Sequence, residues 1–275
     1  MKLIDIGINL MNPSYDRDRE EVVKAAAEAG VTPLVITGSG ERSSLSSALY
    51  ASEHNGRHPH SLFSTAGVHP HEAKNCGTET ISLLRELVKE KPGHGGGEDT
   101  GSVVAIGECG LDYNRDFSPR DVQLRWFVKQ VELAAELSLP LFLHERDAFG
   151  DMSIILREHA KAVPAMVIHC FTGKGDELDH YLSLGCYIGI TGWICDERRG
   201  RHLRELVKNI PPSRLLLETD GPFLLPRDLP IKARNKRNEP RFLPHIAETV
   251  ASCLGKDTAK LAKETFANSK NFFGI

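Results

Sequence analysis

The segment at positions 103–108 is VVAIGE, a short apolar run followed directly by Glu108. A strand that is buried on both faces has such a continuous apolar run instead of an alternating pattern. The arrangement recurs where LPLFL precedes His144, where AMVI precedes His169 and where LLLET precedes Asp220. Catalytic groups of a (β/α)8 barrel lie at the carboxyl ends of its strands. The four residues together therefore predict one active site at the mouth of a parallel barrel.

Eight strand-like segments run along the chain, at 3–8, 33–38, 62–68, 103–107, 140–144, 165–169, 186–191 and 214–218. Amphipathic stretches lie between them, including 16–29, 176–184 and 200–207, and two more follow the last strand at 243–253 and 257–270. This alternation predicts a parallel sheet with right-handed crossovers. Eight repeats in 275 residues favour a (β/α)8 TIM barrel that forms a single domain over residues 1–275. A G-x-G-x-x-G motif does not follow the first strand, which argues against a dinucleotide-binding sheet.

Two segments depart from this rhythm. Residues 91–102 are rich in glycine and precede the fourth strand, so we expect a loop on the amino side of the barrel. Residues 222–240 follow the eighth strand and predict a long loop on the active side. Ser118 and Pro119 predict a serine cap and the first residue of a helix.

The composition is that of an ordinary globular enzyme, with 40% hydrophobic residues, 26% charged residues and a net charge of −3. Such a chain needs a local basic patch to bind nucleic acid. Its six cysteines form no C-x-x-C pair, which indicates reduced thiols and a cytoplasmic protein, or a nuclear one in a eukaryote. We found no secretory or membrane-spanning segment, and we expect a monomer that does not bind membranes.

The four strand-end residues provide carboxylate and imidazole ligands without a thiolate. This set suits Mg²⁺, Mn²⁺ or Zn²⁺. A single histidine at a strand end is more often structural than a ligand, but a buried carboxylate such as Glu108 needs a partner. A divalent ion lowers the pKa of a bound water, so the set predicts hydrolysis at phosphorus or carbonyl carbon, with Asp220 accepting the proton. His69, in AGVHPH after the third strand, is a further candidate ligand or a neighbour of the ligands.

Basic loops follow the seventh and eighth strands. Residues 195–201 include Arg198. Residues 227–241 contain six Lys or Arg, including Arg237, against two acids. Loops at these positions commonly hold phosphate in barrels, and Arg146 is placed to clamp a phosphate. A charge run is more often a solvated face, yet two such loops beside one metal site favour a phosphate-bearing substrate. Trp193 and Phe223 lie in the same loops and are candidates for stacking on bases.

At these residues the sequence resembles the TatD family of metal-dependent deoxyribonucleases. The matching segments span almost the whole chain and are DIGINL (5–10), TAGVHPH (65–71), VVAIGECGLDY (103–113), LPLFLHERDA (139–148), VIHCFTG (167–173), YIGITGWICDERRG (187–200), LLLETDGPFLLPRD (215–228) and RNEP (237–240). The resemblance implies an amidohydrolase-type barrel that hydrolyses DNA phosphodiesters with Mg²⁺ or a similar ion. It also implies a 3′–5′ exonuclease that prefers single strands and binds DNA at a 3′ end.

Residue by residue, the resemblance implies metal-ligand roles for Glu108, His144 and His169. It implies that Asp220 both binds metal and accepts a proton, so that Asp220 and Glu108 are the catalytic carboxylates. The residues that it places near the substrate are His69, Arg146, Asn238 and Glu239.

One departure from the family pattern concerns the end of the first strand. Many relatives have His-x-His there, whereas this chain has Gly7 and Asn9. Asn9 offers an amide oxygen as a ligand and Gly7 offers none. We therefore expect one firmly held ion on the four strand-end residues and a second, weakly bound one.

Two other functions are compatible with these residues. The first is hydrolysis of another phosphate or acyl ester, such as aminoacyl-tRNA deacylation, because barrels of this type act on varied substrates. The second is a catalytically idle, metal-binding partner protein, which the missing His-x-His favours and the retained Asp220 opposes.

Overall fold

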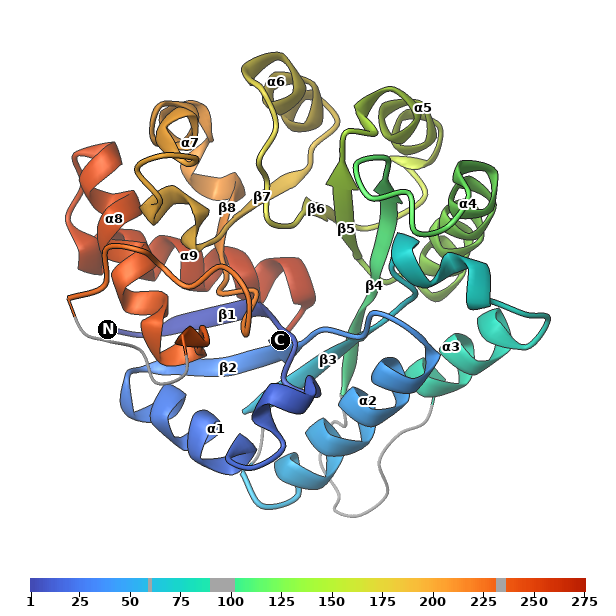
Figure 1. Cartoon of the computed structure of the whole chain (residues 1–275), viewed down its shortest axis with the longest axis horizontal. Coiled ribbons are helices and arrows are strands. Elements are labelled where there is room, and N and C mark those ends of the chain that lie inside the picture. Colours follow the sequence, from blue (N-terminus) through green and yellow to red (C-terminus); the bar gives the residue numbers. More distant parts are fainter. Residues whose placement is uncertain (59–60, 90–101, 231–235) are drawn as a thin grey trace.

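Eight parallel strands form one sheet in sequence order in the computed structural model, which describes residues 1–58, 61–89, 102–230 and 236–275 (Figure 1). The strands are β1 (Leu3–Ile8), β2 (Val31–Ile36), β3 (Leu62–Ala66), β4 (Val103–Asp112), β5 (Leu141–Arg146), β6 (Met166–Ile168), β7 (Tyr187–Ile190) and β8 (Leu215–Leu217). A parallel bridge between Ile8 and Gly221 joins the end of β1 to the segment after β8. The sheet is therefore a nearly closed barrel, and the predicted (β/α)8 architecture is confirmed.

Helices surround this ring of strands in Figure 1. They are α1 (Arg19–Glu28), α2 (Glu41–Asn55), α3 (Thr80–Lys89), α4 (Arg120–Leu137), α5 (Phe149–His159), α6 (Gly175–Ser183), α7 (Arg201–Leu206), α8 (Leu243–Leu254) and α9 (Thr258–Phe273). Within the described part of the chain, no helix is long and apolar enough to cross a membrane.

The barrel interior is a separate apolar cluster. Side chains from the strands, such as Ile6, Phe63 and Phe142, pack there with Phe272 and Phe273 of α9. Helix α9 contacts β1, β8 and the turn that precedes β8. Burial of each phenylalanine side chain contributes about 1.5–3 kcal/mol to the stability of the fold. The two rings close the amino end of the barrel. His144, His169 and Asp220 lie near or beyond the carboxyl ends of their strands, away from these two rings.

Several predicted bounds change in the structure. The predicted strand 103–107 continues to Asp112, so Glu108 lies within β4 and not just after it. The serine cap at Ser118 is wrong, because its hydroxyl donates to the backbone oxygen of His71 and α4 begins at Arg120 without a side-chain cap. The predicted loop at 91–102 lies outside the described residues except for Ser102, and residues 231–235 of the predicted loop 222–240 also lie outside them.

Candidate active site

Glu108 occupies a β-bulge in β4. Gly107 pairs with Phe142 of β5 and Cys109 pairs with Leu143, so Glu108 is an extra residue on its strand. Its backbone N–H donates to the oxygen of Gly38 at 2.7 Å instead of to β5. Gly107 has a φ of +141°, and a Cβ there would lie 2.1 Å from the oxygen of Phe142. Only glycine fits this conformation and approach, and the bulge directs the Glu108 side chain toward the barrel mouth.

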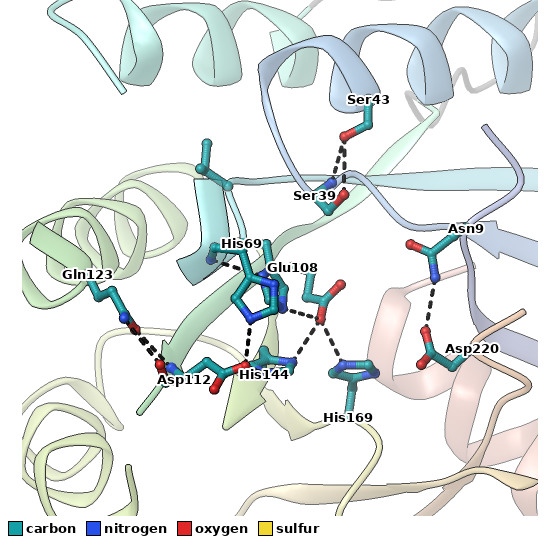
Figure 2. Close-up of polar contacts among 12 residues, drawn as sticks. Asn9, Ser39, Ser43, His69, Glu108, Asp112, Gln123, His144, His169 and Asp220 are labelled. Carbon is teal, nitrogen blue, oxygen red and sulfur yellow. Dashed lines mark hydrogen bonds and ion pairs between the residues drawn. The ribbon is translucent and has the colours of Figure 1, made fainter. Parts of the chain in front are cut away.

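Three imidazoles converge on one oxygen of Glu108 (Figure 2). Glu108 Oε1 lies 2.9 Å from His169 Nε2, 3.1 Å from His144 Nδ1 and 3.3 Å from His69 Nε2. Burial by itself would raise the pKa of Glu108, but the charges of His69 and His169, together with hydrogen bonds from His144 and His169, hold that pKa well below its usual range. The carboxylate therefore stays ionised at the centre of the cluster.

Asp112 supports the cluster from the β4 side. Its Oδ2 lies 2.7 Å from His71 Nε2 and 3.4 Å from His144 Nε2. Its Oδ1 accepts backbone N–H groups from Asn114 and Arg115. Burial would raise the pKa of Asp112, but hydrogen bonds from His144 and His71 lower it overall. Sequence analysis missed Asp112, although residues 108 and 112 share a face of any strand that includes both.

Glu218 orients His169 from the opposite side. Glu218 Oε2 lies 3.3 Å from His169 Nδ1, and Oε1 accepts the backbone N–H of Cys170 at 2.6 Å. A carboxylate on the second ring nitrogen is typical of histidines that bind metal, because it fixes the tautomer and the ring orientation. Glu218 was not predicted either, because the motif ETD (218–220) contains two acids and only Asp220 was taken as a candidate.

The space next to Gly7 is already filled. A Cβ at Gly7 would lie 2.6 Å from Glu218 Oε2 and 2.9 Å from Phe142 Cζ. A histidine at this position would displace both side chains. Glu218 and Phe142 are thus the local reason why the chain has glycine where many relatives have the first histidine of His-x-His.

Asp220 lies beside this cluster and is bound to Asn9 (Figure 2). Asn9 Nδ2 donates to Asp220 Oδ1 at 2.9 Å, and the backbone N–H of Asp220 donates to the oxygen of Gly7. Sequence analysis expected an amide oxygen from Asn9, but the amide nitrogen faces Asp220 because a carboxylate accepts hydrogen bonds. Burial raises the pKa of Asp220 to about 8, and the charge of His169 opposes this only in part. A cation near Asp220 would remove this penalty.

The residues at the mouth suit a divalent ion. The ligand atoms of His69, Glu108 and His144 all lie within 4.8 Å of one another. His144 Nε2 is also buried, and its one ion-pair partner among the described residues is Asp112 Oδ2, at 3.4 Å. Carboxylate and imidazole donors of this kind bind Mg²⁺, Mn²⁺ or Zn²⁺. The sequence analysis gave His69 as either a ligand or a neighbour of the ligands, and the structure places it in the same group as Glu108 and His144.

A cavity of about 840 Å³ opens over the cluster and includes Asn9, Glu108 and Asp220 in its wall. The wall also includes four cationic and two aromatic side chains, Arg115, Arg146, Lys174, Arg199, Trp193 and Phe223, together with the acids Glu72, Asp112, Glu145, Asp147 and Glu177. Phe223 is 52% exposed, which leaves its ring available to a ligand. Arg198 points elsewhere, because its exposed guanidinium lies 3.7 Å from Asp196 and the neighbouring Arg199 is the one that lines the cavity.

The RNEP segment holds the loop after β8 in place. The Arg237 guanidinium is paired with Asp18 and with Glu239. Asn238 Nδ2 donates to the oxygen of Thr219 at 2.8 Å. Sequence analysis placed Arg237, Asn238 and Glu239 next to the substrate, but their polar groups are satisfied within the protein and none of them is among the described residues of the cavity wall. These contacts instead fix the backbone next to Asp220.

A parallel eight-stranded barrel with histidines and carboxylates at its carboxyl end defines a metal-dependent hydrolase of the amidohydrolase type. Comparison with known proteins narrows this class. The family profile described as "TatD related DNase" matches residues 4–274. The chain belongs to this family.

Curated relatives named "3'-5' ssDNA/RNA exonuclease TatD" cover nearly the same length. The protein from Erwinia amylovora is 48% identical over 99% of this chain and 100% of its own. The protein from Escherichia coli K12 is 45% identical over 99% of both chains. A solved TatD family hydrolase from Entamoeba histolytica has a TM-score of 0.86 at 26% identity and covers 99% of this chain and 98% of its own. A solved TatD homologue from Escherichia coli K12, with a TM-score of 0.85 over 99% and 98% of the two chains, is 23% identical and supports the fold alone.

Proposed function

We propose that the protein is a metal-dependent exonuclease that removes nucleotides from the 3′ ends of single-stranded DNA and also of RNA. One observation carries the proposal: three imidazoles converge on Glu108 Oε1 at the floor of a cavity whose wall includes four cationic and two aromatic side chains. The names of the relatives support the strand preference and the direction. They also extend the expected substrate from DNA to RNA.

The ligands that we propose for one firmly held ion are Glu108, His144, His169 and Asp220, with His69 available at the same carboxylate. When bound, a divalent ion lowers the pKa of water and offsets charge on phosphate oxygens. The family resemblance implies Mg²⁺, whereas the imidazole-rich donor set suits Mn²⁺ and Zn²⁺ at least as well. A metal series in the activity assay therefore decides which ion supports turnover.

Asp220 is the proposed proton acceptor. Asn9 occupies its Oδ1, which leaves Oδ2 free to accept a proton from water. Glu218 holds the His169 ring through Nδ1, and Arg146 lies in the cavity wall where it can pair with a non-bridging phosphate oxygen.

The cavity walls account for the choice of a single strand. Phe223 and Trp193 offer aromatic faces to unpaired bases, and such stacking tolerates any sequence. Arg115, Lys174 and Arg199 stand among the acids of the wall and are available to pair with phosphate groups of the strand. In a duplex the faces of the bases are already stacked on one another, so the aromatic side chains would have no partner.

Labelled oligonucleotides blocked at either the 3′ or the 5′ end test this function. We expect metal-dependent shortening of single-stranded DNA and RNA that a 3′ block stops and a 5′ block does not. Chelator and Glu108→Gln should abolish it, while Glu132→Gln, at an exposed position on α4, should not. Cleavage of aminoacyl-tRNA without shortening of any oligonucleotide would instead favour the ester-hydrolase alternative.

The monomeric state and the cytoplasmic location stay predictions. Light scattering coupled to gel filtration tests the first, and a mass close to 30.4 kDa is the expected result.

A further inference from the structure

A second group of metal-ligating side chains lies apart from the catalytic cavity. Cys195 ends the short helix η3 (Gly192–Cys195) after β7, Asp228 lies in the loop after β8, and His245 lies in the first turns of α8. One ligand atom from each of the three lies within 4.8 Å of the other two. None of them is among the described residues of the catalytic cavity wall. Figure 1 shows α7 and α8 as neighbours on this side of the barrel.

The contacts in this group leave the sulfur weakly satisfied. His245 Nε2 lies 2.7 Å from Asp228 Oδ1. Cys195 Sγ donates to Thr249 Oγ1 at 3.4 Å, and Thr249 Oγ1 itself donates to the backbone oxygen of His245. Cys195 is fully buried, whereas the Asp228 side chain is 38% exposed. An ion could therefore enter from the solvent past the carboxylate and reach a thiol that the protein keeps covered.

The three donors select for a particular kind of ion. A thiolate, an imidazole and a carboxylate together are a ligand set of Zn²⁺, and thiolate ligation disfavours Mg²⁺. Bond lengths of about 2.0–2.3 Å place tetrahedral zinc ligands roughly 3.3–3.6 Å apart, so the Asp228–His245 contact would open by less than about 1 Å. A water molecule would complete the tetrahedron.

The charges and protons of the site balance for a divalent ion. Burial raises the pKa of the Cys195 thiol to about 12, so the thiol is protonated in the absence of metal. Metal binding breaks the S–H bond, forms an S–metal bond and releases the proton to solvent. The resulting thiolate and the Asp228 carboxylate carry two negative charges, which match the two positive charges of the ion.

We propose that Cys195, Asp228 and His245 form a zinc-binding site that joins η3, the loop after β8 and α8. Both joined loops contribute to the catalytic cavity, through Trp193 on one and Phe223 on the other. Zinc at this site would restrain the mouth of the cavity without touching the reacting atoms. The inference does not depend on the proposed nuclease function.

Cobalt titration of the purified full chain tests the site, because Co²⁺ replaces zinc and absorbs in the near ultraviolet only when a thiolate is a ligand. We expect this absorption in the wild-type protein, loss of it in Cys195→Ala, and no change in Cys76→Ala, which removes a thiol elsewhere. The proposed catalytic ligands contain no thiolate, and Cys195→Ala keeps Cys170, the thiol in the wall of the catalytic cavity, so the loss of absorption reports on Cys195. Competition with Zn²⁺ should abolish the absorption, whereas Mg²⁺ should not.

His245→Gln provides a second test, because this side chain is partly exposed and its loss does not open the core. We expect the affinity for Co²⁺ to fall by at least about 10- to 100-fold while circular dichroism remains native. Absence of the thiolate absorption in the wild type, its survival in Cys195→Ala, or unchanged affinity in His245→Gln would each overturn the proposal. All of these outcomes are independent of nuclease activity.

Discussion

The two halves of the active site meet at Glu108 Oε1. They differ in how the protein shifts the pKa of a buried carboxylate, downward for Asp112 and upward for Asp220. On the half from β3 to β5, His71, His144 and two backbone N–H groups surround Asp112 and lower its pKa. On the half from β6, β8 and the end of β1, Asp220 receives a hydrogen bond from Asn9, and burial raises its pKa to about 8.

This contrast indicates where a cation is needed. Carboxylates whose surroundings shift their pKa values apart generally have different roles. Asp112 is already compensated by protein groups, so it positions His71 and His144. The protein offsets the burial of the Asp220 carboxylate only in part, so a bound ion would stabilise its charged form more than that of Asp112. The account therefore places the ion between Glu108 and Asp220 and assigns Asp112 a supporting role.

The largest expected effect is that of Glu108→Gln, because this residue belongs to both halves. The substitution keeps the shape of the side chain but removes the charge on which three imidazoles converge. We expect oligonucleotide hydrolysis to fall by at least about 10³-fold, the upper range for loss of a single electrostatic group. Single-turnover kinetics measure this rate. Activity within tenfold of wild type would show that the Glu108 carboxylate is not essential for hydrolysis.

Asp220→Asn and Asp112→Asn separate the two halves. We expect Asp220→Asn to lower the rate roughly 10²- to 10³-fold and to weaken Mn²⁺ binding, because both the proposed base and a ligand are lost. Asp112→Asn should cost less in rate, since it touches only the positioning of His71 and His144. Equal losses of rate and of calorimetric Mn²⁺ affinity in the two variants would contradict the contrast.

The pH dependence of stability in metal-free protein tests the raised pKa of Asp220. The folded value of about 8 lies above the value of about 4 for an unfolded chain. Between these values the native state binds more protons than the unfolded state, so this group lowers the free energy of unfolding as pH rises from about 4 to about 8. Urea unfolding with chelator should show that Asp220→Asn gains stability relative to wild type over this range. A constant difference across the range would show that burial does not shift Asp220.

A smaller effect is expected from Glu218→Gln. The amide can still accept the N–H of Cys170, but it no longer holds His169 through a charged partner. We expect metal affinity to fall about 10- to 100-fold, with most activity restored at saturating metal. Loss of activity that no concentration of metal restores would show that Glu218 does more than orient His169.

The smallest effect compares two exposed phenylalanines. Phe223 follows Asp220 and lines the cavity at 52% exposure, whereas Phe117, at 54%, packs on His71 and is not among the described residues of the wall. We expect Phe223→Ala to raise KM for single strands about fivefold, which corresponds to about 1 kcal/mol of stacking. Phe117→Ala should leave KM within twofold. A larger effect from Phe117 would place the bases over the other half of the site.

Sequence patterns were sufficient for the barrel because each strand has a continuous apolar run and each run precedes an amphipathic stretch. The same patterns found the residues that follow those runs, from Glu108 to Asp220. They did not identify Asp112, because the predicted strand stopped at Gly107. A β-bulge at Glu108 lets β4 continue to Asp112, and a bulge has no periodic signal in the sequence.

Side-chain partners across the barrel were also beyond the sequence. Glu218 contacts His169, which lies 49 positions earlier in the sequence. Arg237 pairs with Asp18, which lies 219 positions earlier. A basic residue in a polar loop has the same local signal whether it meets a phosphate or a carboxylate. In the structure the Arg237 guanidinium contacts the oxygen of Ser14 and the carboxylate of Asp18, just before α1, and no local pattern in the sequence indicates these partners.

Anomalous diffraction from crystals equilibrated with Mn²⁺ tests the central claim most directly. We predict a manganese peak in contact with the Glu108 carboxylate, the His144 and His169 imidazoles and Asp220, and loss of that peak in Asp220→Asn. A peak held only by His69, His144 and Asp112, or a cavity without manganese at a concentration that supports hydrolysis, would contradict it.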